Sequence, residues 1–310
     1  MPLHPAAENL VKLLKDSGVG FTPESTPESM RAAMEVAIRG LPPHEVHSVE
    51  DREIPGPAGS MPVRVYRPGA DGPLPVLVWF HGGGWVIGSL DTHDNLCRLL
   101  CDDAGVIVVS VGYRLAPETK FPGAADDCVA AWAWITEHAA ELGGDRQRIA
   151  LGGDSAGGNL AAVVALVARE QGLPIPALQL LVYPVTDHEF ESASMVDNAK
   201  GYFLETEEMQ WFFDHYANSS ADFADWRMSP LRAPDLTGLP AAVVITAEYD
   251  PLRDQGEAYA QRLRDAGVPT QAVRGDGLFH GFFGMHPFLP PALDPWDVAV
   301  SALRAAFGTA

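Results

Sequence analysis

The pattern Gly-x-Ser-x-Gly at residues 153–157 places the strongest constraint on the fold of this 310-residue chain. Apolar residues 149–151 before it read as the end of a buried strand, and residues 160–168 after it read as a buried helix. Ser155 is therefore expected on a sharp strand-to-helix turn, where a Cβ at either flanking glycine would collide with crowded backbone. Such a turn exposes the serine hydroxyl and points the N–H of Ala156 toward any oxyanion that forms there. Ser155 is a candidate nucleophile.

A second motif is a run of three glycines that follows another apolar segment. Residues 75–80 have the composition of a buried strand and lead into the loop His81-Gly82-Gly83-Gly84-Trp85, which neither a helix nor a strand favours. Unshielded backbone N–H groups in such a loop can each stabilise an oxyanion by about 3 kcal/mol. A phosphate-binding loop fits less well, because no Lys-Ser/Thr pair and no Gly-x-Gly-x-x-Gly spacing is present.

A serine nucleophile needs a base to take its proton and an acid to hold that base in one tautomer. In strand–turn–helix sites of this kind the chain order is serine, acid, histidine. Residues 242–247 read as a strand, and the loop after them contains the candidate acid Asp250. Glu248 and Asp254 are the alternatives, although Asp254 is expected on the next helix, facing water.

The candidate base is one of ten histidines in the chain. His280 comes after the acid and near the C-terminus, where the chain order requires the base. It is expected in a glycine-flanked loop over residues 275–282, after a last strand at residues 270–274. Histidines elsewhere are more simply explained as surface or core residues.

These motifs together resemble the bacterial hormone-sensitive-lipase-like family of carboxylesterases in the α/β-hydrolase superfamily. The resemblance rests on segments between about residues 60 and 285: His81-Gly82-Gly83-Gly84-Trp85, Tyr113-Arg114-Leu115-Ala116-Pro117-Glu118, Gly153-Asp154-Ser155-Ala156-Gly157-Gly158-Asn159, Asp250-Pro251-Leu252-Arg253-Asp254 and His280-Gly281-Phe282.

The resemblance implies a catalytic triad and an oxyanion hole at matching positions. The triad would be Ser155, Asp250 and His280, and the oxyanion donors would be the N–H groups of Gly83, Gly84 and Ala156. It further implies that the segment from Tyr113 to Glu118 braces neighbouring loops, with Arg114 and Glu118 as an ion pair, and that the chain carries a small cap.

The rest of the chain alternates strands with helices, as an α/β fold with a mostly parallel sheet requires. Eight strands are expected near residues 45–53, 62–67, 75–80, 106–112, 148–152, 178–183, 241–247 and 270–274. Helices are expected over residues 93–103, 124–142, 157–170, 206–217, 255–266 and 295–307. The prediction is a single α/β-hydrolase domain over residues 1–310, with its active-site groups at the carboxyl ends of strands.

Two regions fall outside this alternation, about residues 1–45 and about residues 186–228, and both are assigned to a helical cap. In the first, Thr26 can cap a helix that ends at Gly40. In the second, a helix capped by Thr206 places several large apolar side chains on one face.

Aromatic residues of the second cap region are candidates for the lining of an apolar acyl pocket: Tyr202, Phe203 and Phe212. Packing of that face on the core is the simpler interpretation, and both can hold at once.

The composition excludes several classes of partner. A formal charge of −20 and a pI near 4.7 oppose binding to nucleic acid or to an anionic membrane, whereas a neutral small-molecule ester is not repelled. Three cysteines with no framework spacing, and a start without signal-peptide features, predict a reduced, cytoplasmic protein. A homo-oligomer is possible.

No cofactor and no metal ion are expected. His93, Cys97 and Cys101 recur every four residues, as ligands on one helical face could, but a fourth ligand at a zinc-like spacing is missing. Buried cysteines on a core helix explain the pattern more simply.

The predicted function is hydrolysis of short- to medium-chain acyl esters through an acyl-enzyme intermediate. An amidase or deacetylase with the same triad is the alternative within enzymes, and a non-catalytic small-molecule receptor on the same scaffold is the alternative outside them. Neither the natural substrate nor the preferred acyl length or enantiomer follows from the sequence.

Overall fold

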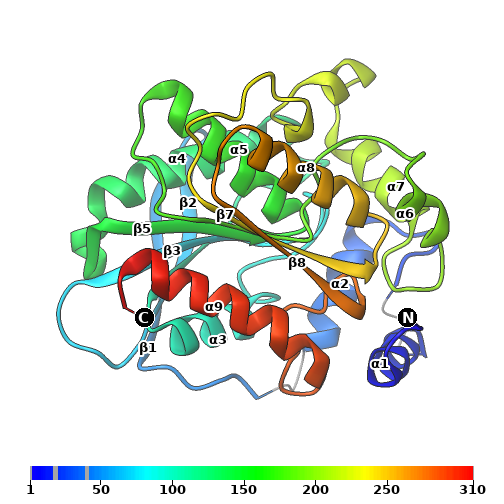
Figure 1. Cartoon of the computed structure of the whole chain (residues 1–310), viewed down its shortest axis with the longest axis horizontal. Helices are drawn as coiled ribbons and strands as arrows, with labels where there is room; N and C mark the ends of the chain where they lie inside the picture. The colour runs from blue at the N-terminus through cyan, green and yellow to red at the C-terminus, as the bar shows by residue number, and fades with distance from the viewer. Residues whose placement is uncertain (1, 17–19, 39–41, 310) are drawn as a thin grey trace.

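The computed structural model describes residues 2–16, 20–38 and 42–309. Its centre is one eight-stranded sheet with the order β1-β2-β4-β3-β5-β6-β7-β8 (Figure 1). The strands are β1 (Ser48–Gly56), β2 (Gly59–Arg67), β3 (Leu74–Phe80), β4 (Ile107–Val111), β5 (Gly144–Asp154), β6 (Gln179–Val182), β7 (Ala242–Tyr249) and β8 (Thr270–Phe279). Only β2 runs against its neighbours, so the predicted eight-stranded, mostly parallel sheet is confirmed.

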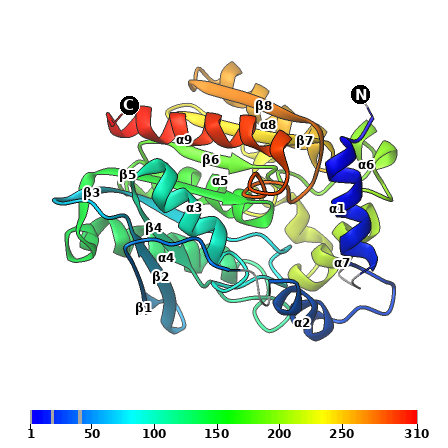
Figure 2. The ribbon, with the colours of Figure 1, turned by 90° about the horizontal axis from the view of Figure 1, so that it is seen from below.

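Helices cover both faces of this sheet (Figure 2). The α-helices are α1 (Pro5–Asp16), α2 (Pro27–Ile38), α3 (Asp94–Ala104), α4 (Gly123–His138), α5 (Ala156–Gln171), α6 (Ala193–Asp197), α7 (Thr206–Tyr216), α8 (Arg253–Asp265) and α9 (Leu293–Phe307). The 3₁₀ helices are η1 (Ala139–Leu142), η2 (Ser220–Ala224), η3 (Pro230–Arg232) and η4 (Pro290–Ala292).

The continuous apolar runs of the central strands follow from this double coverage. Alternate residues of a strand point to opposite faces of the sheet. In β3, Val76, Val78 and Phe80 join the core under α4, α5 and α8, whereas Leu77 and Trp79 join the core under α3 and α9. A strand buried on both faces gains nothing from polar residues, which is why β3 reads as an unbroken apolar segment.

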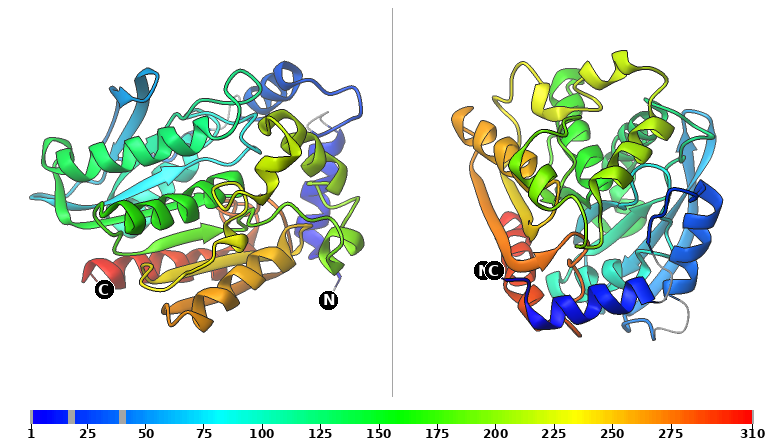
Figure 3. Two further views of the ribbon diagram at one scale, coloured as in Figure 1. Left: turned by 90° about the horizontal axis from the view of Figure 1, so that it is seen from above. Right: turned by 90° about the vertical axis from the view of Figure 1, so that its right-hand side faces the viewer.

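The helices of the two predicted cap regions gather at one end of the molecule (Figure 3). Phe21, between α1 and α2, packs edge-on against Trp211 of α7 with ring centroids 5.9 Å apart. Thr26 caps α2 as predicted, because its hydroxyl accepts the N–H of Ser29 at 3.2 Å. The predicted end of that helix at Gly40 lies outside the described residues.

Three local predictions need correction. The helix predicted over residues 124–142 ends at His138 and continues as η1. Thr206 is the first residue of α7 rather than its cap, because Glu205 occupies the cap position and the Thr206 hydroxyl donates to Met195 O at 2.7 Å.

The third correction concerns the segment before His280, which was predicted as a loop. Residues 275–279 instead continue β8, because pairing with β7 resumes at Tyr249 and Phe279 after a register shift. Gly277 has a φ of +68° within this irregularity, and its N–H donates to the Glu248 carboxylate at 2.7 Å. The glycines therefore accommodate a bulge, and His280 follows the strand directly.

Among the described residues, no helix has the combination of length and apolar character needed to cross a membrane.

Candidate active site

Ser155 occupies a strained turn between β5 and α5. Its φ of 58° and ψ of −118° are unfavourable for a residue with a side chain. A Cβ on Gly153 would overlap the carbonyl of Gly157, and one on Gly157 would overlap the carbonyls at the end of β3. Glycine is therefore required at both flanks so that β5, β3 and the first turn of α5 can approach closely, as the sequence indicated.

The structure brings His280 and Asp250 to this turn. His280 Nε2 lies 3.0 Å from Ser155 Oγ, and His280 Nδ1 lies 2.7 Å from Asp250 Oδ2. The second carboxylate oxygen of Asp250 accepts the N–H of Leu252 at 2.8 Å, which fixes the orientation of the side chain. All three side chains are buried, and Asp250 is fully so.

The two alternative acids have other partners. Glu248 accepts the N–H of Gly277, as described above, and its backbone carbonyl accepts the Arg253 guanidinium at 3.0 Å. Asp254 lies in the first turn of α8, where it accepts the N–H of Ser194 at 2.8 Å and pairs with Arg253. Asp250 is thus the acid that contacts His280.

The glycine loop lies beside Ser155 in a conformation that glycine favours. Gly83 and Gly84 have φ values of 116° and 56°, and the carbonyl of Gly83 accepts the N–H groups of Val86 and Ile87 at 3.0 and 2.9 Å. Among the described residues, neither the N–H of Gly83 nor that of Gly84 is paired with an acceptor. Ala156 is the first residue of α5, where N–H groups lack an intrahelical partner.

A second histidine–aspartate pair stands behind the glycine loop, and the sequence did not reveal it. Asp154 Oδ2 lies 3.3 Å from His93 Nε2, and Asp154 Oδ1 accepts the N–H of Gly82 at 3.1 Å. His93 Nδ1 lies 2.9 Å from Thr92 Oγ1. Asp154 therefore holds the neighbouring glycine loop in place.

Electrostatics of this second pair favour the charged carboxylate. Burial raises the pKa of Asp154, but the charge and hydrogen bond of His93 outweigh that effect and leave the pKa below its ordinary value. Burial and the charge of His93 lower the pKa of the adjacent His81 to about 3, so that this imidazole stays neutral. His81 stacks on Tyr113, whose hydroxyl donates to the His81 carbonyl at 2.7 Å.

Backbone strain is concentrated around Ser155. Among the described residues, the non-glycine residues with positive φ are Trp85, Ser155, Tyr183 and Phe203. Trp85 ends the glycine loop and stacks on Tyr216, with ring centroids 4.6 Å apart. The Tyr183 ring lies 4.5 Å from that of His280. Such strain costs about 1–3 kcal/mol per residue and is characteristic of functional sites.

The three aromatic residues predicted to line a pocket take different positions. The Phe212 ring covers Gly84 so closely that an added Cβ there would overlap it. Phe203 lies against Gly281, next to His280, with 3.4 Å between its Cε1 and an added Cβ. Tyr202 packs on Tyr249, with ring centroids 4.7 Å apart. Their contribution to a substrate pocket stays a prediction.

The predicted ion pair between Arg114 and Glu118 is wrong. Arg114 binds Asp127 of α4 through two nitrogens, at 2.8 and 2.7 Å. Glu118 binds Arg31 of α2 at 2.8 Å, and Arg31 also donates to the carbonyls of residues 86 and 116. Both pairs still brace the loop after β4, but each does so through a partner distant in sequence.

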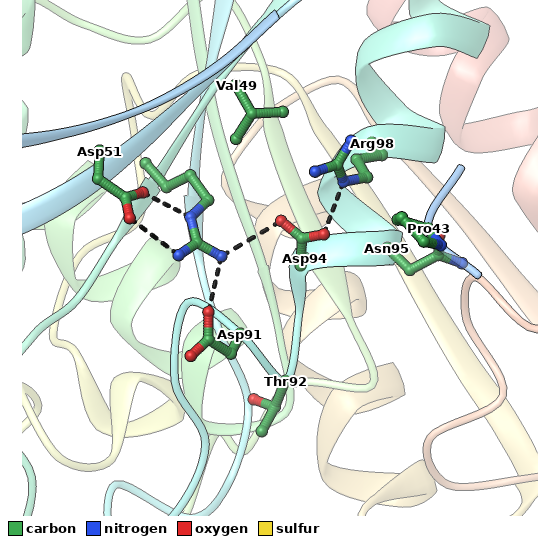
Figure 4. Close-up of a pocket in the computed structure, with 9 residues that line it drawn as sticks. Pro43, Val49, Asp51, Asp91, Thr92, Asp94, Asn95 and Arg98 are labelled. Carbon is green, nitrogen blue, oxygen red and sulfur yellow. Dashed lines mark hydrogen bonds and ion pairs between the residues drawn. The ribbon is translucent and has the colours of Figure 1, made fainter. Parts of the chain in front are cut away.

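A surface cavity of about 510 Å³ lies elsewhere and is lined by charged side chains (Figure 4). Arg64 contacts the carboxylates of Asp51, Asp91 and Asp94 at 2.6, 2.8 and 3.3 Å, and Arg98 pairs with Asp94 at 2.6 Å. These pairs tie β1 and β2 to the start of α3. None of the residues that line the cavity belongs to the Ser155 cluster, which comprises Ser155, His280, Asp250 and the glycine loop at residues 82–84.

Cys97 and Cys101 are buried in the core between α3 and the sheet, and His93 precedes α3. Within residues 2–16, 20–38 and 42–309, no group of three histidine, cysteine or acidic side chains is arranged to hold a metal ion.

Comparison with known proteins is consistent with this geometry. Residues 77–284 match a family described as having the alpha/beta hydrolase fold. The chain is 43% identical to the carboxylic ester hydrolase LipN of Mycobacterium tuberculosis, over 98% of this chain and 83% of that protein. It is 44% identical to an ethyl acetate hydrolase of Pseudomonas putida, over 79% of this chain and 78% of that protein.

Solved structures agree. The ester-hydrolase EH1AB1, from the metagenome of Lake Arreo and complexed with a bipyridine phosphonate derivative, superposes with a TM-score of 0.93 at 44% identity. That match covers 99% of this chain and all of that one. A hyperthermophilic esterase from Pyrobaculum calidifontis superposes with a TM-score of 0.91 at 40% identity, covering 98% and 99% of the two chains.

Proposed function

Because this chain belongs to the hormone-sensitive-lipase-like carboxylesterase family of α/β hydrolases, we propose that it is a serine carboxylesterase using Ser155, His280 and Asp250. The observation that carries the proposal is the continuous hydrogen-bond line from the Asp250 carboxylate through His280 to Ser155 Oγ, with spacings of 2.7 and 3.0 Å. Heavy-atom distances in this range permit proton transfer.

In the first step His280 Nε2 takes the proton of Ser155 as Oγ attacks the ester carbonyl. The carbonyl oxygen becomes negatively charged, and the N–H groups of Gly83, Gly84 and Ala156 stabilise it. Support comes from the unpaired N–H groups of the two glycines and from the position of Ala156 at the start of α5. Collapse of this intermediate releases the alcohol, which takes the proton from His280, and leaves an acyl-enzyme.

In the second step water attacks the acyl-enzyme, and His280 takes the proton of that water. Cleavage of the bond to Ser155 Oγ releases the carboxylic acid, and Oγ regains its proton from His280. Asp250 keeps the imidazole in the required tautomer and stabilises its charged form. The N–H of Leu252 and the complete burial of Asp250 support this role, because both hold the carboxylate in one orientation.

The proposal assigns about residues 1–45 and about residues 186–228 to a cap over a single α/β-hydrolase domain. The packing of Phe21 on Trp211 and of Phe212 on Gly84 supports this assignment. Tyr202, Phe203 and Phe212 contribute to an apolar pocket for short- to medium-chain acyl groups. Neutral esters fit the formal charge of −20 better than anionic ones.

Turnover of p-nitrophenyl esters by the Ser155→Ala variant tests the mechanism. The substitution should lower kcat by about 10⁴-fold or more, because it removes the proposed nucleophile. We expect the fold to stay intact. Retained turnover in a preparation free of other esterases would contradict the assignment. Release of alcohol by the unmodified protein excludes a non-catalytic receptor, and matched ester and amide substrates separate an esterase from an amidase.

A further inference from the structure

The segment from Phe203 to Phe212 crosses the Ser155 cluster from one side to the other. Phe203 lies against Gly281, beside His280, and the Phe212 ring covers Gly84 of the glycine loop. Glu208 lies between them, one helical turn before Phe212 and on the same face of α7. Glu208 therefore lies on the face of α7 that packs, through Phe212, against the glycine loop.

The carboxylate of Glu208 is buried without a positive partner. The residue is only 8% exposed, and among the described residues no side chain forms an ion pair or a hydrogen bond with its carboxylate. Its neighbour Glu207 is exposed and lies 3.7 Å from Lys200. The N–H of Glu205 stabilises this carboxylate, but no described side chain forms an ion pair with it; such burial is costly, so the position of Glu208 needs an explanation.

The electrostatic environment agrees with this placement. Burial raises the pKa of Glu208 to about 7, although the N–H of Glu205 and the charge of His280 oppose that effect. The charge of Glu205 raises the pKa further. An effect of His280 on this pKa agrees with the position of Glu208 on the face of α7 that also carries Phe212.

A glutamate in the first turn of a helix also stabilises the N-terminus of that helix. That role needs no burial, because an exposed glutamate interacts with the helix dipole equally well. It explains why an acidic residue is tolerated in the first turn of α7, but it does not explain why the side chain is buried.

We propose that Glu208 makes this enzyme prefer esters that carry a cationic ammonium group near the scissile carbonyl. An ammonium group would supply the missing counter-charge, and the rings of Phe203 and Phe212 would offer their faces to the same cation. The formal charge of −20 would raise the local concentration of such substrates. The inference rests on the proposed esterase function and specifies the substrate class of that site.

The test uses pairs of esters with the same shape and different charge. Acetylcholine and 3,3-dimethylbutyl acetate place the charge on the alcohol side. The p-nitrophenyl esters of 4-(trimethylammonio)butanoic acid and 5,5-dimethylhexanoic acid place it on the acyl side. The ratio of kcat/KM for the cationic and neutral ester is measured for the unmodified enzyme, for Glu208→Gln and for the matched control Glu207→Gln.

For the alcohol-side pair, the acyl-side pair or both, the cationic-to-neutral ratio of kcat/KM should fall about tenfold in Glu208→Gln and change little in Glu207→Gln. In the unmodified enzyme it should rise between pH 6 and pH 8 as Glu208 ionises, and in Glu208→Gln it should stay flat. The ratio removes pH effects that are common to the two esters, because both need the same base. Equal ratios in the three proteins on both sides would overturn the inference and leave the esterase function intact.

A binding measurement keeps the two proposals separable. Calorimetry with Ser155→Ala, alone and combined with Glu208→Gln, compares acetylcholine with its neutral isostere without any turnover. Tighter binding of acetylcholine that requires Glu208 supports the inference. Equal affinity in both proteins overturns it, whereas absence of turnover with every neutral ester would overturn the esterase function.

Discussion

Two buried histidine–aspartate pairs flank the Ser155 turn, and only one of them is arranged for proton transfer. His280 uses Nδ1 for Asp250 at 2.7 Å and directs Nε2 to Ser155 Oγ. His93 uses Nε2 for Asp154 at 3.3 Å, and its Nδ1 faces the Thr92 hydroxyl. The same two residue types therefore give a proposed base in one pair and a support for the glycine loop in the other. The two pairs differ in what the second imidazole nitrogen contacts, which is Ser155 Oγ in one pair and Thr92 Oγ1 in the other.

The largest expected contrast is between alanine substitutions of the two histidines. His280→Ala should lower kcat by about 10⁵–10⁶-fold, because the base is lost. His93→Ala should lower it by less than about 10²-fold, because only the position of the glycine loop changes. Both are measured with one p-nitrophenyl ester at saturation, after circular dichroism has verified the folds. Comparable losses in the two variants would break the distinction between the pairs.

Substitution of Asp250 should likewise lower kcat more than substitution of Asp154. Asp250→Asn should lower kcat by about 10⁴-fold, because an amide favours the wrong imidazole tautomer. Asp154→Asn keeps an oxygen that can accept the N–H of Gly82, so we expect a loss of about tenfold. The pH profile of kcat separates the two: the Asp250 variant should recover activity at alkaline pH, and the Asp154 variant should keep the normal profile. A large loss in Asp154→Asn would mean that the second pair acts on the reacting atoms.

The sequence predicted the first pair because its signals are local. A serine between two glycines, an acid after one strand and a histidine after the next follow from strand ends that meet at one edge of a sheet. The sheet was predictable for the same reason, since each strand is an apolar segment buried on both faces.

The second pair left no such signal. Asp154 and His93 are 61 residues apart, and His93 attracted attention only through its spacing from Cys97 and Cys101. The ion pairs of Arg114 and Glu118 were mispredicted for a similar reason, because their partners Asp127 and Arg31 lie on helices outside the loop that holds Arg114 and Glu118. Side-chain pairing between distant segments depends on packing geometry, which one sequence does not encode in a readable pattern.

The pH dependence of the unfolding free energy tests the structural role of Asp154. The pKa of Asp154 is below its ordinary value of 3.8 in the folded state, so the charged carboxylate stabilises the fold at neutral pH. This contribution is complete above the unfolded-state pKa and is lost as the pH falls through the folded-state value. Asp154→Asn should therefore cost about 1–3 kcal/mol of unfolding free energy at pH 7, and the difference should shrink below pH 4. Urea titrations at pH 7, 5 and 3.5 measure it; a constant difference would mean that the charge of Asp154 is not what stabilises the fold.

The smallest expected effect comes from Thr92, which shows whether the second pair is only structural. Thr92→Val keeps the side-chain shape but removes the hydroxyl that faces His93 Nδ1 and that also accepts the N–H of Ser89 at 2.8 Å. Loss of these hydrogen bonds should cost about 1 kcal/mol of unfolding free energy, and Thr92→Ser should restore most of it. We expect kcat to change less than in Asp154→Asn, because the contact between Asp154 and Gly82 is retained. If Thr92→Val instead reduced kcat more than Asp154→Asn does, His93 would be acting in the reaction through its own orientation rather than through the glycine loop.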